Sequence, residues 1–263
     1  MPAIRSHRTP PPVDREIRLA GGDTRWRVPE ETPVALIYNG RNYAVMLATP
    51  SDLADFAVGF SLTERIVETV NEIESIDLYC DERGVDVRLT VTEKAVERFD
   101  VRQQRRNLVG RSGCGVCGIE NAEVFFEQLP SVSEHRLIIP EEILLKAAGE
   151  LPTFQPLNRR THTVHAAAWA SSNGAIRIAR EDVGRHNALD KLLGAMALGG
   201  VSTGEGFVVM SSRCSYEIVE KAARLGVRAV LSISAPTAFA IRKAKEANMA
   251  LYVMAGDSVV AID

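Results

Sequence analysis

The sequence predicts an α/β protein in which a smaller N-terminal α+β subdomain precedes a C-terminal domain built on a parallel sheet. From residue 207 onward, apolar strands alternate with amphipathic helices in the order β-α-β-α-β, which is typical of a parallel sheet covered by helices. Before residue 130, hairpin signals alternate with single helices instead. A chain of 263 residues is long enough to form one large or two modest domains around proper cores.

The composition is that of an ordinary globular protein and excludes several function classes. Hydrophobic residues make up 46% and charged residues 25%, and the net charge of -3 provides no general basic field for nucleic acid. No run of about 18 apolar residues could span a membrane, and residues 1–12 lack the apolar centre of a signal peptide. Four cysteines are too few for a disulfide scaffold. We therefore expect a cytoplasmic protein that binds neither nucleic acid nor membranes.

The N-terminal subdomain, residues 13–130, follows a proline-rich stretch at 1–12 that we predict to be a disordered tail. Asn39-Gly40 is the strongest signal for a type I′ hairpin turn, and Ser51 offers an N-cap to a helix. The expected elements are strands at 33–38 and 43–47, a helix at 52–67, strands at 75–80 and 85–91, and helices at 92–99 and 120–129. Residues 130–140 are predicted to be the linker to the next domain.

The C-terminal domain, residues 141–263, is predicted to begin with a short helix at 141–149 and a proline-broken loop at 151–158. The remaining expected elements are strands at 175–179, 207–210, 227–233 and 250–254, with helices at 215–225 and 236–247. Open α/β sheets bind ligands beyond the C-terminal ends of their strands. We therefore expect a ligand at that edge.

A paired-thiol loop at 107–119 carries Cys114 and Cys117 among four glycines. The glycines let the loop present both sulfurs without a rigid helix. Positive charge favours the thiolate, which is the nucleophilic form, and four arginines lie nearby in sequence: Arg102, Arg105, Arg106 and Arg111. The pattern favours a reactive carrier thiol. A zinc half-site completed by other cysteines or histidines, a thioredoxin-like redox pair and two incidental cysteines stay as alternatives.

Two predicted strand ends carry hydroxyl groups. Ser211-Ser-Arg-Cys-Ser215 and Ser234-Ala-Pro-Thr237 each place hydroxyls and free backbone N–H groups at the start of a helix, which favours an anion such as phosphate. Arg213 would add a bidentate clamp. Ordinary capping by Ser215 and Ser234 is the alternative.

The other dense polar segment runs from residue 180 to 194. In its first half, carboxylates suited to guanine-type N–H donors and cations suited to phosphates gather around a glycine: Glu181, Asp182, Arg185, His186 and Asn187. Its second half is an amphipathic helix, and Asp190 and Lys191 are expected on its outer face. A solvated loop is the alternative for the first half. Upstream, His162 and His165 are weaker candidates for a metal or sulfur site.

Three motifs together resemble the formate dehydrogenase accessory sulfurtransferase family: Cys-Gly-Val-Cys-Gly at 114–118, Glu-Asp-Val-Gly-Arg-His-Asn-Ala-Leu-Asp-Lys at 181–191 and Ser-Ala-Pro-Thr at 234–237. The resemblance extends from about residue 51 to the C-terminus. It implies a cytidine deaminase-like, three-layer C-terminal domain and a homodimer in the cytoplasm. It also implies that Cys114 accepts sulfur from a cysteine desulfurase as a persulfide, with Cys117 as its partner.

The acceptor implied by this resemblance is the molybdenum bis-guanine-dinucleotide cofactor of the formate dehydrogenase catalytic subunit, which would bind as a substrate; no resident metal is expected. The cofactor-binding residues would be Glu181, Asp182, Arg185, His186, Asn187, Ser212, Arg213, Ser234, Ala235, Pro236, Thr237, Met254, Ala255, Gly256, Asp257, Ser258 and Val259. Similar proteins usually carry an aromatic residue and arginines in the last of these segments, which this chain lacks. A non-catalytic cofactor chaperone with a redox-sensing cysteine pair is the alternative function. A zinc deaminase is disfavoured by the order of its would-be ligands.

Overall fold

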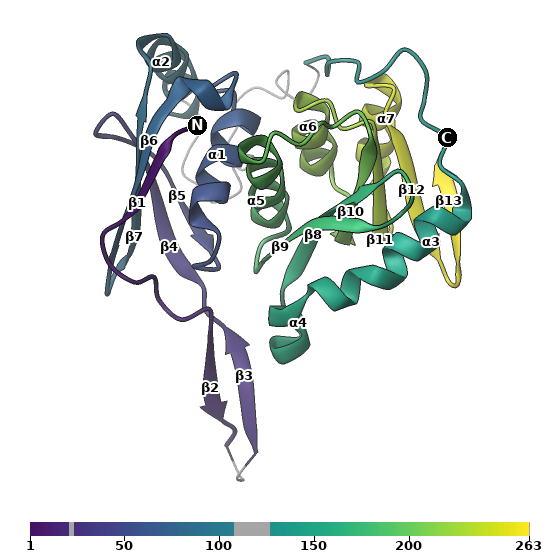
Figure 1. The fold of residues 1–263 in the computed structure, drawn as a ribbon, viewed down its shortest axis with the longest axis horizontal. Helices are drawn as coiled ribbons and strands as arrows, with labels where there is room; N and C mark the ends of the chain where they lie inside the picture. Colours follow the sequence, from purple (N-terminus) through teal and green to yellow (C-terminus); the bar gives the residue numbers. More distant parts are fainter. Residues whose placement is uncertain (21–23, 108–126, 263) are drawn as a thin grey trace.

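The computed structural model describes residues 1–20, 24–107 and 127–262. The loop with Cys114 and Cys117, and most of the helix predicted at 120–129, lie outside the described residues. Two sheets stand side by side, with helices α1 (Leu53–Thr63) and α5 (Arg185–Leu198) packed between them (Figure 1). The α/β class predicted from the sequence is confirmed.

The N-terminal sheet has five strands in the order β1-β6-β7-β4-β5. They are β1 (Ala3–Ser6), β4 (Thr32–Tyr38), β5 (Arg41–Ala48), β6 (Ile73–Asp81) and β7 (Gly84–Val91), accompanied by the short 3-10 helix η1 (Val70–Glu72) and helix α2 (Glu93–Asn107). Apolar residues alternate along the strands, so one face buries Leu36, Ile76 and Val87 against Phe56 and Phe60 of α1. The other face meets no helix of the described chain (Figure 1).

The predicted hairpin at Asn39-Gly40 is confirmed, because both residues have positive φ, 46° and 79°, as a type I′ turn requires. The β6–β7 hairpin is also present. The N-cap of α1 is Asp52 rather than Ser51, and α1 ends at Thr63 rather than at residue 67. α2 extends eight residues beyond the predicted end at 99, to Asn107.

The prediction of a disordered tail at residues 1–12 was wrong for its first part. Ala3–Ser6 forms the edge strand β1, which pairs in parallel with β6 from Ser75 to Leu78. All four residues of β1 are exposed, so the strand is held by ladder hydrogen bonds rather than by apolar burial. A hydrophobic pattern therefore could not reveal it.

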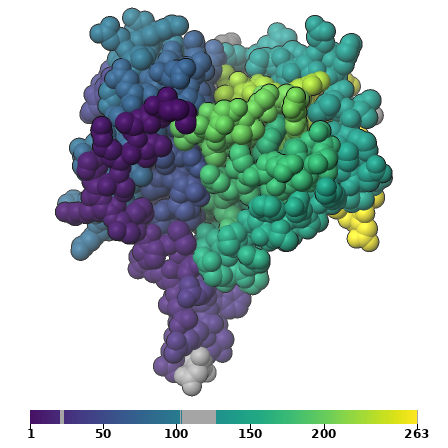
Figure 2. Space-filling view, viewed as in Figure 1, coloured from purple at the N-terminus to yellow at the C-terminus, as the bar shows by residue number. Residues whose placement is uncertain are grey.

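Strands β2 (Asp14–Arg18) and β3 (Arg25–Pro29) form a separate two-stranded hairpin. It projects from the body of the molecule in both views (Figures 1 and 2). An ion pair between Arg160 and Asp14, with 2.8 Å between Nη2 and Oδ2, fastens its base to helix α4 (Pro156–Thr161) of the C-terminal domain.

The C-terminal sheet has six strands in the order β13-β12-β11-β10-β8-β9. They are β8 (His165–Ser171), β9 (Ile176–Asp182), β10 (Gly206–Arg213), β11 (Ala229–Ser234), β12 (Ala250–Ala255) and β13 (Ser258–Ile262). Strands β10, β11 and β12 are parallel, as the β-α-β-α-β pattern predicts, whereas β8, β9 and β13 join by antiparallel pairing. The sheet is therefore mixed.

Helices cover both faces of this sheet. One face packs on α3 (Glu141–Glu150) and the 3-10 helix η3 (Leu151–Phe154). The other packs on α5, α6 (Tyr216–Arg224) and α7 (Ala238–Glu246). These are three layers, as expected; the likeness to cytidine deaminases stays a prediction. Residues 151–158 were expected to be a loop but form η3 and the start of α4 (Pro156–Thr161), because Pro152 and Pro156 occupy first turns, where proline is tolerated.

Helix α5 is buried on both sides because α1 covers the side that does not face the sheet. The two helices cross at glycines: a Cβ on Gly194 would lie 1.8 Å from the carbonyl oxygen of Asp55, and one on Gly59 would lie 1.8 Å from that of Asp190. The prediction that Asp190 and Lys191 face outward was wrong, since they are 1% and 0% exposed. No helix in the described part of the chain has the length and apolar character needed to cross a membrane.

Candidate functional site

The segments that carry the predicted cofactor-binding residues meet at one edge of the C-terminal sheet. Strand β9 is antiparallel to β8, and β8 is antiparallel to β10, so β9 runs in the same direction as β10, β11 and β12. The C-terminal ends of these four strands, at Asp182, Arg213, Ser234 and Ala255, therefore share an edge. At about 4.8 Å per strand, the row from β9 to β12 is about 19 Å long. An elongated ligand would fit such a row.

Three helices begin at this edge, directly after β9, β10 and β11. The N-cap positions of α5 and α6, Gly184 and Ser215, make no side-chain capping hydrogen bond. At α7 the cap is Thr237, whose hydroxyl accepts from the amide of Ala240 at 3.2 Å. Ordinary capping by Ser215 and Ser234 is therefore not what the structure shows. Backbone N–H groups at the starts of α5 and α6 stay available, and the helix dipoles favour an anion there.

Four basic side chains gather where β8, β9 and β10 meet this edge. Burial lowers the pKa of His165, and the positive charges of Arg185, His186 and Arg213 lower it further. These neighbours favour the neutral form of His165, which lies near the guanidinium groups of Arg185 and Arg213. The Nε atom of Arg185 is buried without a hydrogen-bond partner in the described residues. A buried guanidinium N–H without an acceptor indicates a place for an anion that the protein itself does not supply.

His186 is oriented by two residues of the next strand–helix junction. Its Nε2 lies 3.0 Å from Oε2 of Glu217 and 3.3 Å from Oγ of Ser215. The Ser215 hydroxyl in turn donates to Glu217 at 2.9 Å. Burial alone would raise the pKa of Glu217, but the hydrogen bond and charge of His186 and the bond from Ser215 lower it to about 2. Glu217 thus fixes the ring of His186 and ties the start of α5 to the start of α6.

Three predicted ligand residues point into the protein rather than toward the edge. Oε1 and Oε2 of Glu181 accept hydrogen bonds from the amides of Asn158 and Leu157, which are the free donors at the start of α4. Oδ1 of Asp182 accepts from the amide of Gly184 at 2.8 Å and from the side chain of Asn187 at 3.0 Å. All three of these side chains are buried.

Asp182 also joins the site to the N-terminal subdomain. Its Oδ2 accepts from the amide of Thr49 at 2.9 Å and pairs with Nζ of Lys191 at 2.7 Å. Nζ of Lys191 donates to the carbonyl of Thr49 at 2.9 Å, and the side chain of Asn187 donates to the carbonyl of Leu47 at 2.8 Å. The turn that presents Arg185 and His186 is therefore held directly by the end of β5 and the residue that follows it.

The remaining predicted positions differ in exposure. Arg213, Ser234, Ala235 and Thr237 are exposed at the edge, and Pro236 is half-buried. Ser212 is buried and its hydroxyl donates to the carbonyl of Arg213. The segment 254–259 forms the turn between β12 and β13: Met254 and Ala255 end one strand, Gly256 and Asp257 form the turn, and Ser258 and Val259 begin the next. It occupies the far end of the row.

Sequence reasoning missed Glu217 as a site residue, considered Ser215 only among the hydroxyl groups of its strand end, and left His165 outside the predicted ligand set. Glu217 could have been noticed as an acid in the first turn of a helix that begins at the predicted anion edge. His165 carries no such signal, since only the pairing of β8 with β9 places it opposite Asp182. Within residues 1–20, 24–107 and 127–262, no three histidine, cysteine or acidic side chains are grouped so as to hold a metal ion.

The chain belongs to the FdhD/NarQ family, whose model matches residues 29–261. Among similar proteins is the sulfur carrier protein FdhD of Chromobacterium violaceum, 47% identical over 229 residues, which cover 86% of this chain and 83% of the relative. The sulfur carrier protein FdhD of Xanthomonas euvesicatoria is 44% identical over 260 residues, which cover 97% and 91%. A crystal structure of a candidate formate dehydrogenase accessory protein from Desulfotalea psychrophila has a similar fold, with a TM-score of 0.70 over 95% of both chains at 23% identity.

Proposed function

We propose that this protein is a sulfur carrier in the maturation of formate dehydrogenase. The support comes from the curated relatives, which are named sulfur carrier proteins and match most of the chain. In the finer form of this proposal, Cys114 accepts sulfur from a cysteine desulfurase and passes it to the molybdenum bis-guanine-dinucleotide cofactor. The protein would act as a homodimer in the cytoplasm.

The sulfur step is a thiol–disulfide type of exchange. The thiolate of Cys114 attacks the terminal sulfur of the donor's persulfide, a new S–S bond forms, and the donor's cysteine leaves as a thiolate. No net oxidation takes place. Cys117, three positions further along the chain, can then assist release of the sulfur by attacking the carrier cysteine, which leaves a disulfide and frees sulfide.

The observation that supports cofactor binding is the cationic edge of the C-terminal sheet. The buried, unpartnered Nε of Arg185, the exposed Arg213 and the uncapped starts of α5 and α6 suit the phosphates of a guanine dinucleotide. The row of about 19 Å leaves room for more than one nucleotide unit. The turn at 254–259 provides backbone groups at its far end but no cation.

We assign different tasks to the residues first expected to bind the cofactor. Arg185, His186 and Arg213 would contact phosphate groups, with His186 held in place by Glu217. Asp182 and Asn187 would act as positioning residues, because their side chains bind to the turn and to the N-terminal subdomain. Glu181 would hold the start of α4.

Mass spectrometry after incubation with a cysteine desulfurase and cysteine tests the carrier chemistry. We expect added, reductant-labile sulfur on the 110–118 peptide of the wild type and none on Cys114→Ala, while Cys117→Ala accepts sulfur and releases it slowly. Cys214→Ala is a matched control, because burial raises the pKa of the Cys214 thiol to about 12 and makes it unreactive.

Two outcomes would redirect the proposal. Sulfur that still reaches the Cys114→Ala protein would reject Cys114 as the carrier. An absence of sulfur on every protein, together with retained binding of the cofactor, would favour the alternative of a cofactor chaperone whose cysteine pair senses redox state.

A further inference from the structure

The open face of the N-terminal sheet, on the side away from α1, carries exposed apolar side chains. Val45 is 60% exposed, Leu47 is 53% exposed and Tyr79 is 38% exposed. Pairing places Leu47 opposite Pro33 and Val45 opposite Ala35, so these residues lie side by side on this face. Apolar side chains that gather on an uncovered face indicate a binding surface more often than isolated ones do.

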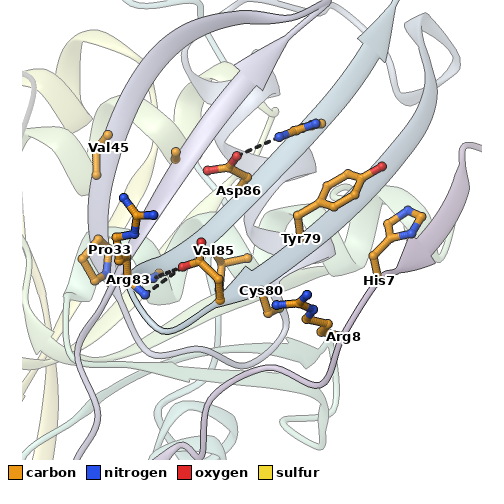
Figure 3. Close-up of a pocket in the computed structure, with 13 residues that line it drawn as sticks. His7, Arg8, Pro33, Val45, Tyr79, Cys80, Arg83, Val85 and Asp86 are labelled. Carbon is orange, nitrogen blue, oxygen red and sulfur yellow. Dashed lines mark hydrogen bonds and ion pairs between the residues drawn. The ribbon is translucent and has the colours of Figure 1, made fainter.

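A pocket of about 670 Å³ lies on this face and crosses four strands, from Val45 on β5 to Tyr79 on β6 (Figure 3). We call it the outer pocket. Three strand spacings of about 4.8 Å make it about 14 Å long, which matches about four residues of an extended peptide. The strand residues Pro33, Ala35 and Val45 form its apolar floor, and charged residues also line it.

Tyr79 is a rigid aromatic anchor at one end of the outer pocket. The ring of His7 stacks on it with 4.2 Å between centroids and 6° between planes. The guanidinium carbon of Arg88 lies 4.4 Å from the centre of the same ring. Because its neighbours already hold the ring, a partner that packs on it would lose little side-chain entropy on binding.

The charges around the outer pocket are not balanced. Three arginines, Arg8, Arg83 and Arg88, line it with two carboxylates: Asp86 pairs with Arg88 at 3.1 Å, and Oδ1 of Asp81 accepts from the backbone amides of Arg83 and Gly84. In contrast, the side chains of Arg8 and Arg83 have no hydrogen bond or ion pair with any residue that the structure describes. Figure 3 shows Arg83 beside Pro33, toward Val45, and Arg8 beside Cys80. Two unpaired guanidinium groups thus flank an apolar floor.

We propose that the outer pocket binds a protein segment in which acidic residues flank apolar ones, presented by a partner protein. The carboxylates would pair with Arg8 and Arg83, and the apolar side chains would cover Val45 and pack on Tyr79. A second copy of this chain fits less well, because it would bring arginines against arginines. Nucleic acid also fits less well, because the chain carries a net charge of -3.

The outer pocket is independent of the candidate site. The N-terminal sheet and the layer of α1 and α5 separate it from the C-terminal sheet (Figure 1). A partner bound there would leave the edge with Arg185 and Arg213 open. Binding at the outer pocket therefore does not depend on the proposed sulfur transfer.

Fluorescence anisotropy with two labelled peptides tests the proposal on the full-length chain. One peptide alternates glutamate with valine and serine, and the other has lysine in place of every glutamate. We expect saturable binding of the acidic peptide only. Arg8→Glu combined with Arg83→Glu should weaken it by about tenfold or more, or about 1.4 kcal/mol. Val45→Asp, at a position that is 60% exposed, should weaken it as well.

Matched controls separate the outer pocket from general charge effects. Arg177→Glu combined with Lys245→Glu changes the net charge equally at exposed positions elsewhere and should leave binding unchanged. Arg213→Ala should also leave it unchanged, because Arg213 belongs to the other site. Three results would each overturn the proposal: no binding of the acidic peptide, equal binding by the double charge-reversal protein, or displacement of the peptide by an equal concentration of a short oligodeoxythymidine.

Discussion

The crossing of α1 and α5 at two glycines leads to a quantitative prediction about the framework of the site. A Cβ on Gly194 would lie 1.8 Å from the carbonyl oxygen of Asp55, whereas ordinary contacts begin at 3.4 Å. Gly194→Ala must therefore push the helices about 1.6 Å apart. Overpacking of this kind costs about 1–3 kcal/mol, and the widened interface loses dispersion contacts in addition. The helix propensity of alanine offsets up to about 1 kcal/mol.

We expect Gly194→Ala to lower the free energy of unfolding by about 2–4 kcal/mol, and Gly59→Ala to have an effect of the same size, because its Cβ meets the oxygen of Asp190 at the same distance. The double variant should lose much less than the sum. The helices need to separate only once, so the second alanine enters space that the first has opened. A coupling energy of about 2 kcal/mol should result.

Urea denaturation of the wild type, the two single variants and the double variant completes a double-mutant cycle, which measures this coupling energy. Gly149→Ala is the control, because it lies in α3 with nothing within 4 Å of the added Cβ. It should stabilise the protein by about 0.5–1 kcal/mol. The reasoning fails if Gly194→Ala behaves like Gly149→Ala, or if the two crossing variants add to within about 0.5 kcal/mol.

Two further predictions concern the buried charges. Lys191→Met leaves the carboxylate of Asp182 without its cation and should lower the free energy of unfolding, measured by urea denaturation, by about 3–5 kcal/mol. Adding Asp182→Asn to this variant should recover part of that loss. A loss below about 1 kcal/mol for Lys191→Met would contradict the role of the pair. Because the pKa of Glu217 falls from 4.5 to about 2 on folding, its contribution is present above pH 4.5 and is lost as the pH falls toward 2. Glu217→Gln should therefore be less stable at pH 6 and lose less stability between pH 6 and pH 3 than the wild type, with the exposed Glu142→Gln as control; the difference over this pH range is about 2 kcal/mol, and parallel pH profiles would contradict it.

The sequence predicted the hairpin turn and the alternating strands and helices well, because the sequence signals for these features are local. The turn at Asn39-Gly40 and the β-α-β-α-β alternation after residue 207 depend on residues close to one another in the chain. Strand β1 was missed because its stability comes from pairing with β6, about seventy residues away. The antiparallel strands β8 and β13 were not predicted, since their place in the sheet is also set by distant partners.

The candidate site was predicted in position but only partly in role. The density of polar residues at 181–191 indicates a ligand surface, and Arg185 and His186 do lie at the expected edge. The amphipathic pattern gave the wrong face for Asp190 and Lys191, because a helix covered on two sides has no solvent face on which to place its charges. Its charges are paired instead: Oδ2 of Asp190 lies 2.8 Å from Nζ of Lys221. Burial alone would lower the pKa of Lys221, but the charges of Asp190, Glu64 and Glu220, with the hydrogen bond to Asp190, together raise it.

The buried pairs give the polar segment 181–191 a second purpose beside ligand binding. Asp182 holds the amide of Thr49 with one oxygen and the turn at Gly184 with the other. A ligand that binds Arg185 therefore contacts a turn that is hydrogen-bonded, through Asp182, to Thr49 of the N-terminal subdomain. If α5 shifts when the edge is occupied, α1 must shift with it, because Gly59 and Gly194 leave no space between the helices. The alanine variants of Gly59 and Gly194 and the Lys191→Met variant thus perturb the same connection between the two domains, at the helix crossing and at the buried ion pair.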